Sequence, residues 1–228
     1  MEALPPDLVI FDVDGTLNGI ELWWPDLIRK GLRRFADAMG LELKEPDDRA
    51  ALLVVGEKDA GVWSPFLPQD QQHRWDELRA MVLPMEVELL RSGRDFLYPG
   101  VRDVLGRLRE HGVRLALASN CGGEYMAAIA EGQGLAALTD WQFCLDSQGV
   151  ADKADMLREA MRVAGTRRAV MVGDRRSDQL AAIASGIPFF WRANDLCRID
   201  DADGIWSGDV EGLLSLLGLP RISCPEAE

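Results

Sequence analysis

Apolar and polar positions along this chain follow two periods, one typical of buried strands and the other of amphipathic helices. The segment 8–11 joins four apolar residues that favour β structure and ends abruptly at a carboxylate, which predicts a strand buried on both faces. From Gly100 onward the two patterns alternate regularly. Helices are expected at 101–110, 124–131, 154–163 and 177–184, and strands at 113–118, 141–145, 169–172 and 188–191. This order predicts an α/β fold, a doubly wound parallel sheet with helical crossovers.

The section between the first strand and Gly100 has the helical period. Pro25 suits the first turn of a helix, and Gly40 is a natural end for it. Pro84 is expected to break or kink a helical continuation to Leu90. The helices expected in this section cover residues 27–39, 48–55 and 71–82.

The position of this helical section in the chain predicts an insertion. The first strand precedes the section and the other strands follow it, so we interpret it as a lid over the strand ends. The dipeptides Asn18-Gly19 and Pro99-Gly100 mark its boundaries, because such pairs interrupt regular structure and can act as hinges. The expected division is a discontinuous core domain of residues 1–18 and 98–220, a small helical cap domain of residues 19–97, and a flexible tail of residues 221–228.

Composition narrows the class of protein. With 228 residues and 47% hydrophobic content, the chain can bury a full core. A formal net charge of −13 argues against nucleic-acid binding, because no basic stripe is available to replace phosphate counterions. No segment reaches the ~18 consecutive apolar residues of a membrane span. We therefore expect a cytoplasmic protein without nucleic-acid or membrane partners; its oligomeric state cannot be read from the sequence.

The cysteines do not suggest a metal or redox centre. The four of them lack CxxC or CxxH spacing, so neither a zinc site nor a disulfide framework is expected. Cys121 follows a candidate functional loop, but a thiol needs a nearby base to become a nucleophile, and the chain has only two histidines. Reduced, mostly buried thiols are the expectation.

Polar residues gather where the predicted strands end. Asp12 and Asp14 follow the first strand, and Gly15 lets the chain turn so that both carboxylates approach one point. Ligands of open α/β sheets bind beyond the carboxyl ends of the strands. Three further motifs occur at matching positions along the chain, namely Ser119-Asn120, Lys153, and Gly173-Asp174 through Asp178. Hydroxyl, amide, ammonium and carboxylate groups in this order are those that a phosphate site with a metal ion needs.

These four motifs resemble those of the haloacid dehalogenase superfamily. The resemblance covers nearly the whole chain, and the first and fourth motifs are the specific ones. The helical section after the first motif is similar to the type-1 cap of that family. The segment 173–186 is similar to phosphoglycolate-phosphatase-like members.

The resemblance implies a role for each motif residue. Asp12 is the expected nucleophile that forms an aspartyl-phosphate, and Asp14 the expected acid and base. Ser119 and Lys153 are expected to bind the non-bridging phosphate oxygens, with Asn120 as a further possible ligand. Lys153 precedes Ala154, where the family often has proline. A magnesium ion is expected to bind Asp12, the backbone carbonyl of Asp14, and Asp174. Asp178 is expected to be either a further ligand or a residue that holds the ligands in place.

Other residues leave two interpretations open. Lys58 lies where related enzymes place a specificity loop, and it either meets a second anionic group or stays solvated. Arg175 and Arg176 either offset the negative charge near the site or face solvent. Four tryptophans of the insertion either pack a small cap or form an aromatic substrate wall, namely Trp23, Trp24, Trp63 and Trp75.

The function that these features predict is a Mg²⁺-dependent phosphatase that hydrolyses a small phosphorylated metabolite. Asp14 argues against halide displacement, which needs no general acid. A phosphomutase of the same family shares every catalytic residue and remains an alternative. A receiver-like protein and a catalytically silent binding protein are disfavoured, the first by the inserted helices and the second by the Asp12 and Asp14 pair.

Overall fold

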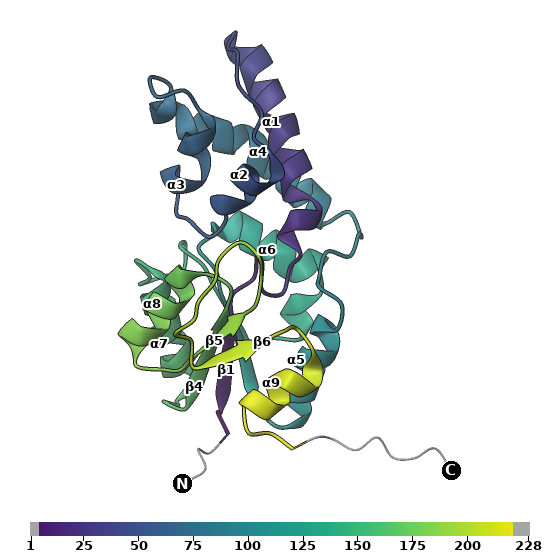
Figure 1. Ribbon diagram of the computed structural model, residues 1–228, viewed down its shortest axis with the longest axis vertical. Helices are drawn as coiled ribbons and strands as arrows, with labels where there is room; N and C mark the ends of the chain where they lie inside the picture. The colour runs from purple at the N-terminus through teal and green to yellow at the C-terminus, as the bar shows by residue number, and fades with distance from the viewer. Residues whose placement is uncertain (1–4, 221–228) are drawn as a thin grey trace, which may run out of the picture.

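The fold is built around a central parallel sheet. The structure is a computed structural model and describes residues 5–220. Within these residues the sheet has six strands, all parallel, in the order β3-β2-β1-β4-β5-β6 (Figure 1). The strands are β1 (Leu8–Phe11), β2 (Arg114–Ala118), β3 (Trp141–Phe143), β4 (Ala169–Gly173), β5 (Phe189–Arg192) and β6 (Gly204–Trp206). This architecture confirms the predicted α/β fold with a doubly wound sheet.

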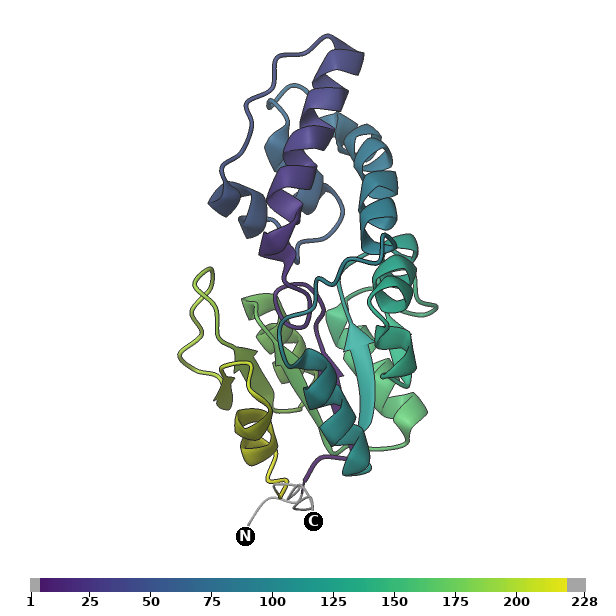
Figure 2. The ribbon, with the colours of Figure 1, turned by 90° about the vertical axis from the view of Figure 1, so that its right-hand side faces the viewer.

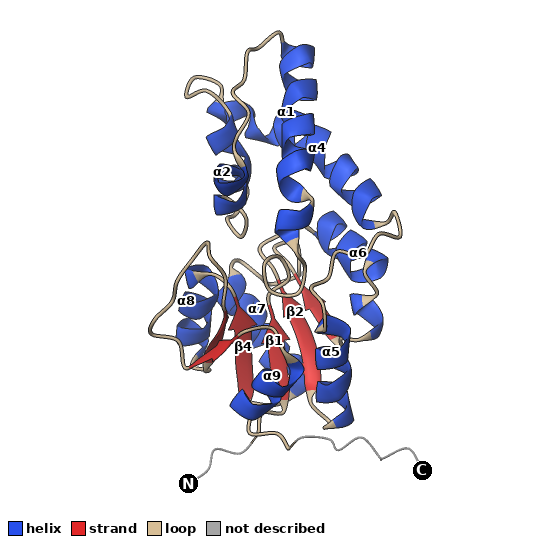
Figure 3. Cartoon of the chain, turned by 45° about the vertical axis from the view of Figure 1, so that its right-hand side comes forward, coloured by secondary structure: helices blue, strands red, loops and turns tan. Residues whose placement is uncertain are grey.

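Helices cover both faces of the sheet because its central strands are apolar on both sides. Leu8 and Ile10 of β1 pack into one core layer, whereas Val9 and Phe11 pack into the other, and all four are fully buried. The first layer contains α7 (Lys153–Ala164) and α8 (Arg176–Ser185), and the second contains α5 (Val101–Glu110), α6 (Gly123–Gly132) and α9 (Val210–Leu216) (Figure 3).

The strand order places a crevice at the end of β1. The chain runs from β1 to β2 and β3 on one side and to β4, β5 and β6 on the other. Loops that leave adjacent strands therefore diverge at the carboxyl end of β1, which is where doubly wound sheets bind ligands. The predicted motif residues Asp12, Ser119 and Asp174 each come directly after one of the three central strands.

The section between β1 and α5 forms a group of helices beyond the carboxyl ends of the strands (Figure 2). The first helix begins with proline in its first turn and ends at Gly40, which has a left-handed backbone, as the sequence predicts. These helices are α1 (Trp24–Met39), α2 (Asp48–Leu53), α3 (Ala60–Trp63) and α4 (Trp75–Leu90). Short 3₁₀ turns accompany them at η1 (Ile20–Leu22), η2 (Ser64–Phe66) and η3 (Gln72–Arg74), and a fourth, η4 (Leu135–Ala137), follows α6.

Helix α4 differs from its prediction, because it runs unbroken through Pro84. Proline removes one backbone donor, but the buried stripe of Leu78, Val82 and Leu90 holds both halves of the helix in the hydrophobic core. Packing thus outweighs the local cost of the proline. Of the predicted break or kink at Pro84, the break is wrong, because the helix is continuous from Trp75 to Leu90.

The last strand and helix are additions that the hydrophobic pattern did not indicate. Strand β6 has only three residues and pairs with β5 through the register of Arg192 with Trp206. Helix α9 begins at the cap residue Asp209, whose carboxylate accepts a hydrogen bond from the backbone N–H of Gly212 at 2.6 Å. Fully buried Trp206 packs edge-on against Phe11 of β1, so this extension completes the core on that face.

The two segments that connect the insertion to the sheet lie side by side. The backbone N–H of Gly19 donates to the carbonyl of Phe96 at 2.7 Å, and that of Tyr98 donates to Leu17 at 2.9 Å. The chain thus enters and leaves the insertion at one place, which is where a hinge between a core and a cap would lie. The predicted division into these two domains remains a proposal, and the predicted tail lies outside the described residues.

Among residues 5–220, no helix combines the length and apolar character needed to cross a bilayer.

Candidate active site

Asp12 and Asp14 lie where β1 ends and the chain turns. The N–H of Asp12 still donates to the carbonyl of Val172 at 2.9 Å, so its backbone is fixed by the sheet. Gly15 then adopts a φ of +82°, and a Cβ at this position would lie 2.5 Å from a carboxylate oxygen of Asp174. The turn therefore requires glycine for its backbone angle and for space. It brings the first motif against the fourth.

Three carboxylates meet around one ammonium group. Oxygens of Asp12, Asp174 and Asp178 lie within 4.8 Å of one another, and all three residues are buried. The ammonium of Lys153 donates to Asp12 at 2.7 Å and to Asp178 at 2.5 Å, with its side chain 5% exposed. Residues predicted from three separate motifs are thus brought together at one point.

Neighbouring residues fix the position of Asp174. Its Oδ2 accepts a hydrogen bond from Nδ2 of Asn194 at 3.1 Å and lies 3.3 Å from Nε of Arg175. The hydroxyl of Thr16 donates to Oδ1 at 3.5 Å. Asp178 is held by its second oxygen, which accepts the N–H of Arg175 at 2.9 Å. The carboxylates are therefore oriented before any ligand binds.

The three carboxylates carry more negative charge than Lys153 and Arg175 together offset. Burial raises the pKa of Asp12 to about 7, against the lowering effect of the Lys153 ammonium. Burial and the charges of Asp12 and Asp178 likewise raise the pKa of Asp174 well above its usual value. Three buried carboxylates beside one ammonium and one guanidinium are a costly arrangement unless a further cation binds them. Oxygen-only donors of this kind fit a hard divalent ion such as Mg²⁺.

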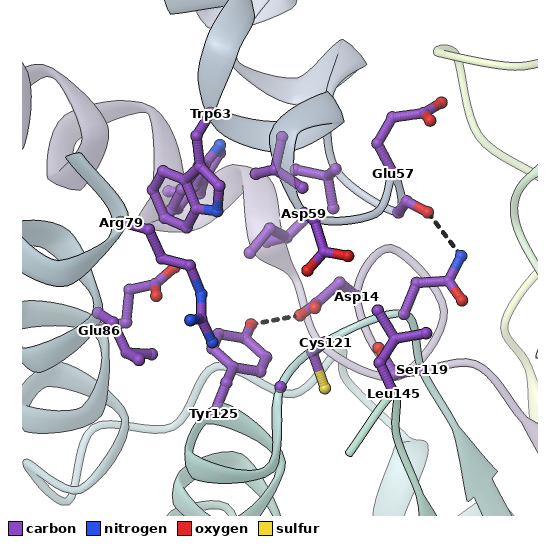
Figure 4. Close-up of a pocket in the computed structure, with 18 of the residues that line it drawn as sticks. Asp14, Glu57, Asp59, Trp63, Arg79, Glu86, Ser119, Cys121, Tyr125 and Leu145 are labelled. Carbon is purple, nitrogen blue, oxygen red and sulfur yellow. Dashed lines mark hydrogen bonds between the residues drawn. The ribbon is translucent and has the colours of Figure 1, made fainter. Parts of the chain in front are cut away.

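Asp14 faces away from that cluster and has its own partners. Its Oδ1 accepts a hydrogen bond from Nδ2 of Asn18 at 2.6 Å. It also accepts one from the hydroxyl of Tyr125 at 2.8 Å (Figure 4). Loss of water contact raises the pKa of Asp14, although both hydrogen bonds lower it. The two carboxylates of the first motif therefore have different surroundings, as an acid and a nucleophile require.

Ser119 and Asn120 follow β2, as predicted, but their surroundings differ. Ser119 is 5% exposed and its N–H donates to Phe143 at 3.1 Å. The amide of Asn120 donates to the carbonyl of Gly56 at 2.9 Å, which ties this loop to the insertion, while its Oδ1 is buried without a hydrogen-bond partner. The side-chain NH2 of Asn120 thus connects the core to the insertion, and its Oδ1 remains free to accept a hydrogen bond from another group.

A cavity of about 170 Å³ lies between this site and the inserted helices (Figure 4). This volume is below the ~300–1,000 Å³ of sites for drug-sized ligands, so the cavity suits a small molecule. Asp12, Asp14 and Ser119 line its core side, and the insertion supplies the opposite wall. Residues of the insertion that line it are Ile20, Trp24, Val55, Gly56, Glu57, Asp59, Val62, Trp63, Arg79, Leu83 and Glu86.

Comparison with known proteins identifies the family. The model of the haloacid dehalogenase-like hydrolases matches residues 6–186. This chain belongs to that family. The match includes all four motifs, so the predicted family and the prediction of a hydrolase are confirmed.

Individual relatives agree with this assignment. The haloacid dehalogenase-like chain is 30% identical over 199 residues to a phosphoglycolate phosphatase of Pseudomonas savastanoi, covering 80% of this chain and 67% of that protein. It is 31% identical over 191 residues to phosphoglycolate phosphatase 1 of Pseudomonas aeruginosa, with the same coverage. Among solved structures, a haloacid dehalogenase-like family protein of Streptococcus pneumoniae superposes with a TM-score of 0.73 at 19% identity, over 94% of this chain and 99% of that one. CbbY of Rhodobacter sphaeroides, in complex with phosphate, gives 0.67 at 22% identity, over 94% and 100%.

The structure distinguishes the two arginines that the sequence left open. Arg175 lies beside Asp174, and its Nη2 donates to the carbonyl of Leu52 in α2 at 2.8 Å. Arg176 instead pairs with Asp201 and is 52% exposed. Arg175 therefore offsets negative charge at the site and contacts the insertion, whereas Arg176 faces solvent.

Lys58 does not reach the cavity. Its ammonium donates to the carbonyl of Ala151 at 3.2 Å, and the residue is not among those that line the cavity wall. Its neighbours Glu57 and Asp59 line that wall instead. A role for Lys58 in substrate choice finds no support in this arrangement.

The tryptophans pack the insertion, and two of them also border the cavity. Trp24 packs edge-on against Trp23 and Trp63, with ring centroids 6.2 and 5.6 Å apart, and all three are buried. Trp24 and Trp63 are at the same time part of the cavity wall. Trp75 is half-buried and lies outside it. Trp24 and Trp63 therefore both pack the insertion and form part of the wall that a substrate would meet.

Tyr125, Glu86 and Arg79 line the cavity and were not predicted from the sequence. All three lie within helices, where a single polar residue gives no motif.

Cys121 also lines the cavity, but burial and the charge of Asp14 raise the pKa of its thiol well above the usual value. The thiol stays protonated, in agreement with the expectation from the sequence.

Glu86 is a buried acid whose ionisation should weaken the fold. Burial and the charge of Asp14 raise its pKa to about 8, from 4.5. As the pH rises from about 4.5 to 8, the unfolded chain loses this proton while the folded chain retains it, so stability falls. The Gln side chain cannot ionise. We therefore expect the free energy of unfolding of Glu86→Gln, relative to that of the wild type, to rise by an amount on the order of a few kcal/mol from pH 5 to pH 8.5. Urea unfolding at both pH values measures this; a difference that does not change with pH would contradict it.

Proposed function

We propose that this chain is a Mg²⁺-dependent phosphatase that hydrolyses a small phosphate monoester through an aspartyl-phosphate on Asp12. The observation that carries the proposal is that two carboxylates of different surroundings meet at one cavity. Asp12 belongs to the buried cluster with Lys153, while Asp14 is held apart by Tyr125 and Asn18. Named phosphatases among the relatives support the same activity.

In the first step, a carboxylate oxygen of Asp12 attacks the phosphorus atom. A bond forms between that oxygen and phosphorus, and the bond between phosphorus and the ester oxygen breaks. Asp14 gives its proton to the leaving oxygen, so that an alcohol departs rather than an alkoxide. The raised pKa of Asp14 favours the protonated form that this step requires.

In the second step, water attacks the phosphorus of the aspartyl-phosphate. Asp14, now ionised, takes a proton from this water, and the bond between phosphorus and Asp12 breaks to release inorganic phosphate. Both carboxyl groups return to their starting protonation states, so the cycle balances. One residue thus acts as acid and then as base.

Charge neutralisation supports both steps. A phosphoryl group carries negative charge that repels Asp12 and must be offset. Lys153, the first residue of α7, and the hydroxyl of Ser119, which follows β2, would do so. Mg²⁺ bound at Asp12, Asp174 and Asp178, and at the backbone carbonyl of Asp14, would add positive charge on the phosphoryl oxygens.

The experiment that tests this function is phosphate release from a panel of substrates. Purified protein is assayed with phosphoglycolate, sugar phosphates, nucleotides and a chromogenic aryl phosphate, with Mg²⁺ or with a chelator. We expect release from small monoesters that depends on the metal. Activity that is unchanged in the chelator would contradict the metal dependence, and interconversion of isomers that needs a bisphosphate would indicate a phosphomutase instead.

Binding of the metal should also be visible in stability. Mg²⁺ at 100 times its dissociation constant is expected to stabilise the wild type by about 2.7 kcal/mol, because only the folded chain assembles the cluster. Asp174→Asn should lose most of this gain, since it removes one buried carboxylate. Asp37→Asn, an exposed change on α1, is the matched control and should keep it. Thermal unfolding with and without Mg²⁺ measures the effect; an equal gain in both variants would place the metal elsewhere.

A further inference from the structure

One face of α4 presents a cation, an apolar side chain and an acid to the cavity. Arg79, Leu83 and Glu86 are spaced at i, i+4 and i+7, so they form a stripe along the helix, and all three line the cavity. Figure 4 shows Arg79 and Glu86 close together above Tyr125. The mechanism proposed above uses neither charged residue.

Arg79 is the only basic residue among those that line the cavity within the described part of the chain. Every other charged residue in this lining is acidic. No side-chain hydrogen bond or ion pair joins the Arg79 guanidinium to another residue within 5–220, whereas arginines on the surface of α4 and its neighbours pair with carboxylates, as Arg74 does with Glu77 and Arg91 with Glu131. Glu86 is close enough for the Arg79 charge to lower its pKa, but it makes no ion pair with Arg79. A cation in a cavity that makes no ion pair is arranged to meet an anionic ligand.

The loop that follows the predicted phosphate ligands leaves room for this guanidinium. A Cβ on Gly122 would lie 2.7 Å from Nη2 of Arg79, so a larger residue at this position would require the guanidinium to move. Asp146 also lies beside Gly122, and its carboxylate accepts the N–H of Gly123 at 2.6 Å. Arg79 thus lies directly beside the loop that carries Ser119 and Asn120.

Glu86 gives a second, independent indication of a ligand. It is 5% exposed, lines the cavity and has no hydrogen-bond partner among the described residues. A buried polar group without a partner is costly, so the position is more favourable when a ligand atom fills it. The polar groups of Arg79 and Glu86 are therefore both available on the side of the cavity formed by the insertion.

We propose that Arg79 determines specificity by binding a second anionic group, a carboxylate or a second phosphate, on the leaving-group side of the ester. This inference rests on the proposed phosphatase function and narrows its substrates to small acidic phosphate monoesters. The cavity of about 170 Å³ suits a leaving group of a few carbon atoms. The acidic residues elsewhere in the lining leave Arg79 as the one side chain there that attracts a second anion.

A matched pair of esters tests this assignment. Phosphoglycolate and 2-hydroxyethyl phosphate have leaving groups of similar size, but only the first carries a carboxylate. We expect Arg79→Leu to lower kcat/KM for phosphoglycolate by about 10- to 100-fold and to change that for 2-hydroxyethyl phosphate by less than about 3-fold. Arg79→Lys should lose less, because it keeps the charge without the two-pronged geometry. Ethylene glycol bisphosphate, assayed in the same way, shows whether a second phosphate can replace the carboxylate.

The control is Arg91→Leu, which removes an exposed arginine at the end of the same helix, outside the cavity. It should leave both rates unchanged. Equal losses for both esters with Arg79→Leu would overturn the proposal, and so would a wild type that prefers the neutral ester.

A binding measurement separates this proposal from the phosphatase function. Calorimetry with the Asp12→Asn variant measures phosphoglycolate affinity without turnover, with Arg79 intact or replaced by leucine. A 10- to 100-fold weaker affinity without Arg79 supports its role even if no ester is hydrolysed, a result that would reject only the proposed catalysis. An affinity that does not depend on Arg79 would overturn the assignment.

Discussion

Asp12→Asn should reduce phosphate release by a factor on the order of 10⁴ to 10⁶, the range expected when a nucleophile that acts with its partners is removed. The amide is a poor nucleophile toward phosphorus, so the first step of the proposed reaction cannot take place. The substitution keeps the size of the side chain and one oxygen that can accept the hydrogen bond now made from Lys153 at 2.7 Å. The loss should therefore arise from chemistry and not from unfolding.

Thermal unfolding of Asp12→Asn provides the control for this first prediction. Removing one of three clustered carboxylates relieves repulsion, so the variant should unfold at a temperature no lower than the wild type in the absence of metal. A folded Asp12→Asn protein that retains activity within about tenfold of the wild type would exclude Asp12 as nucleophile.

Asp14→Asn should affect esters in proportion to how much their leaving group needs a proton. For alkyl phosphates such as phosphoglycolate, we expect kcat/KM to fall by about 10²- to 10⁴-fold, the usual contribution of a general acid and base. For an aryl phosphate such as 4-nitrophenyl phosphate, the phenolate leaves without protonation, and the loss should be markedly smaller. Steady-state rates for both ester types measure the contrast.

Tyr125→Phe is the matched control for this second prediction, because it removes the hydroxyl that donates to Asp14 at 2.8 Å and leaves the carboxyl in place. It should lower the rates of both esters much less than Asp14→Asn does. If Asp14→Asn reduced alkyl and aryl esters by the same factor, Asp14 would not act as the proton donor, and its role would be to hold the site together.

The sheet and the positions of the aspartates could be predicted from sequence because both depend on local features. Strand β1 is apolar on both faces, and its abrupt end at Asp12 marks the carboxyl edge where doubly wound sheets bind ligands. Lys153 begins α7, and Asp178 lies in the first turn of α8 just after β4, so their arrival at the same edge follows from topology.

The remaining site residues depend on contacts between elements that are far apart in the chain. Tyr125 meets Asp14 across 111 residues, and Arg79 meets Gly122 only because α4 packs against α6. A single arginine or glutamate on an amphipathic helix resembles any solvated side chain until the opposite wall is known. Strand β6 escaped prediction for a similar reason, since three residues become a strand only through pairing with β5.

The central claim, an aspartyl-phosphate on Asp12, is tested most directly by trapping it. The protein is mixed with Mg²⁺ and phosphoglycolate, quenched in acid during turnover, digested with protease and analysed by mass spectrometry. The account predicts that the peptide that contains Asp12 gains the mass of one phosphoryl group, and that this gain is absent in Asp12→Asn. A wild-type protein that turns over substrate while this peptide stays unmodified, or that carries the phosphoryl group on another residue, would contradict the account.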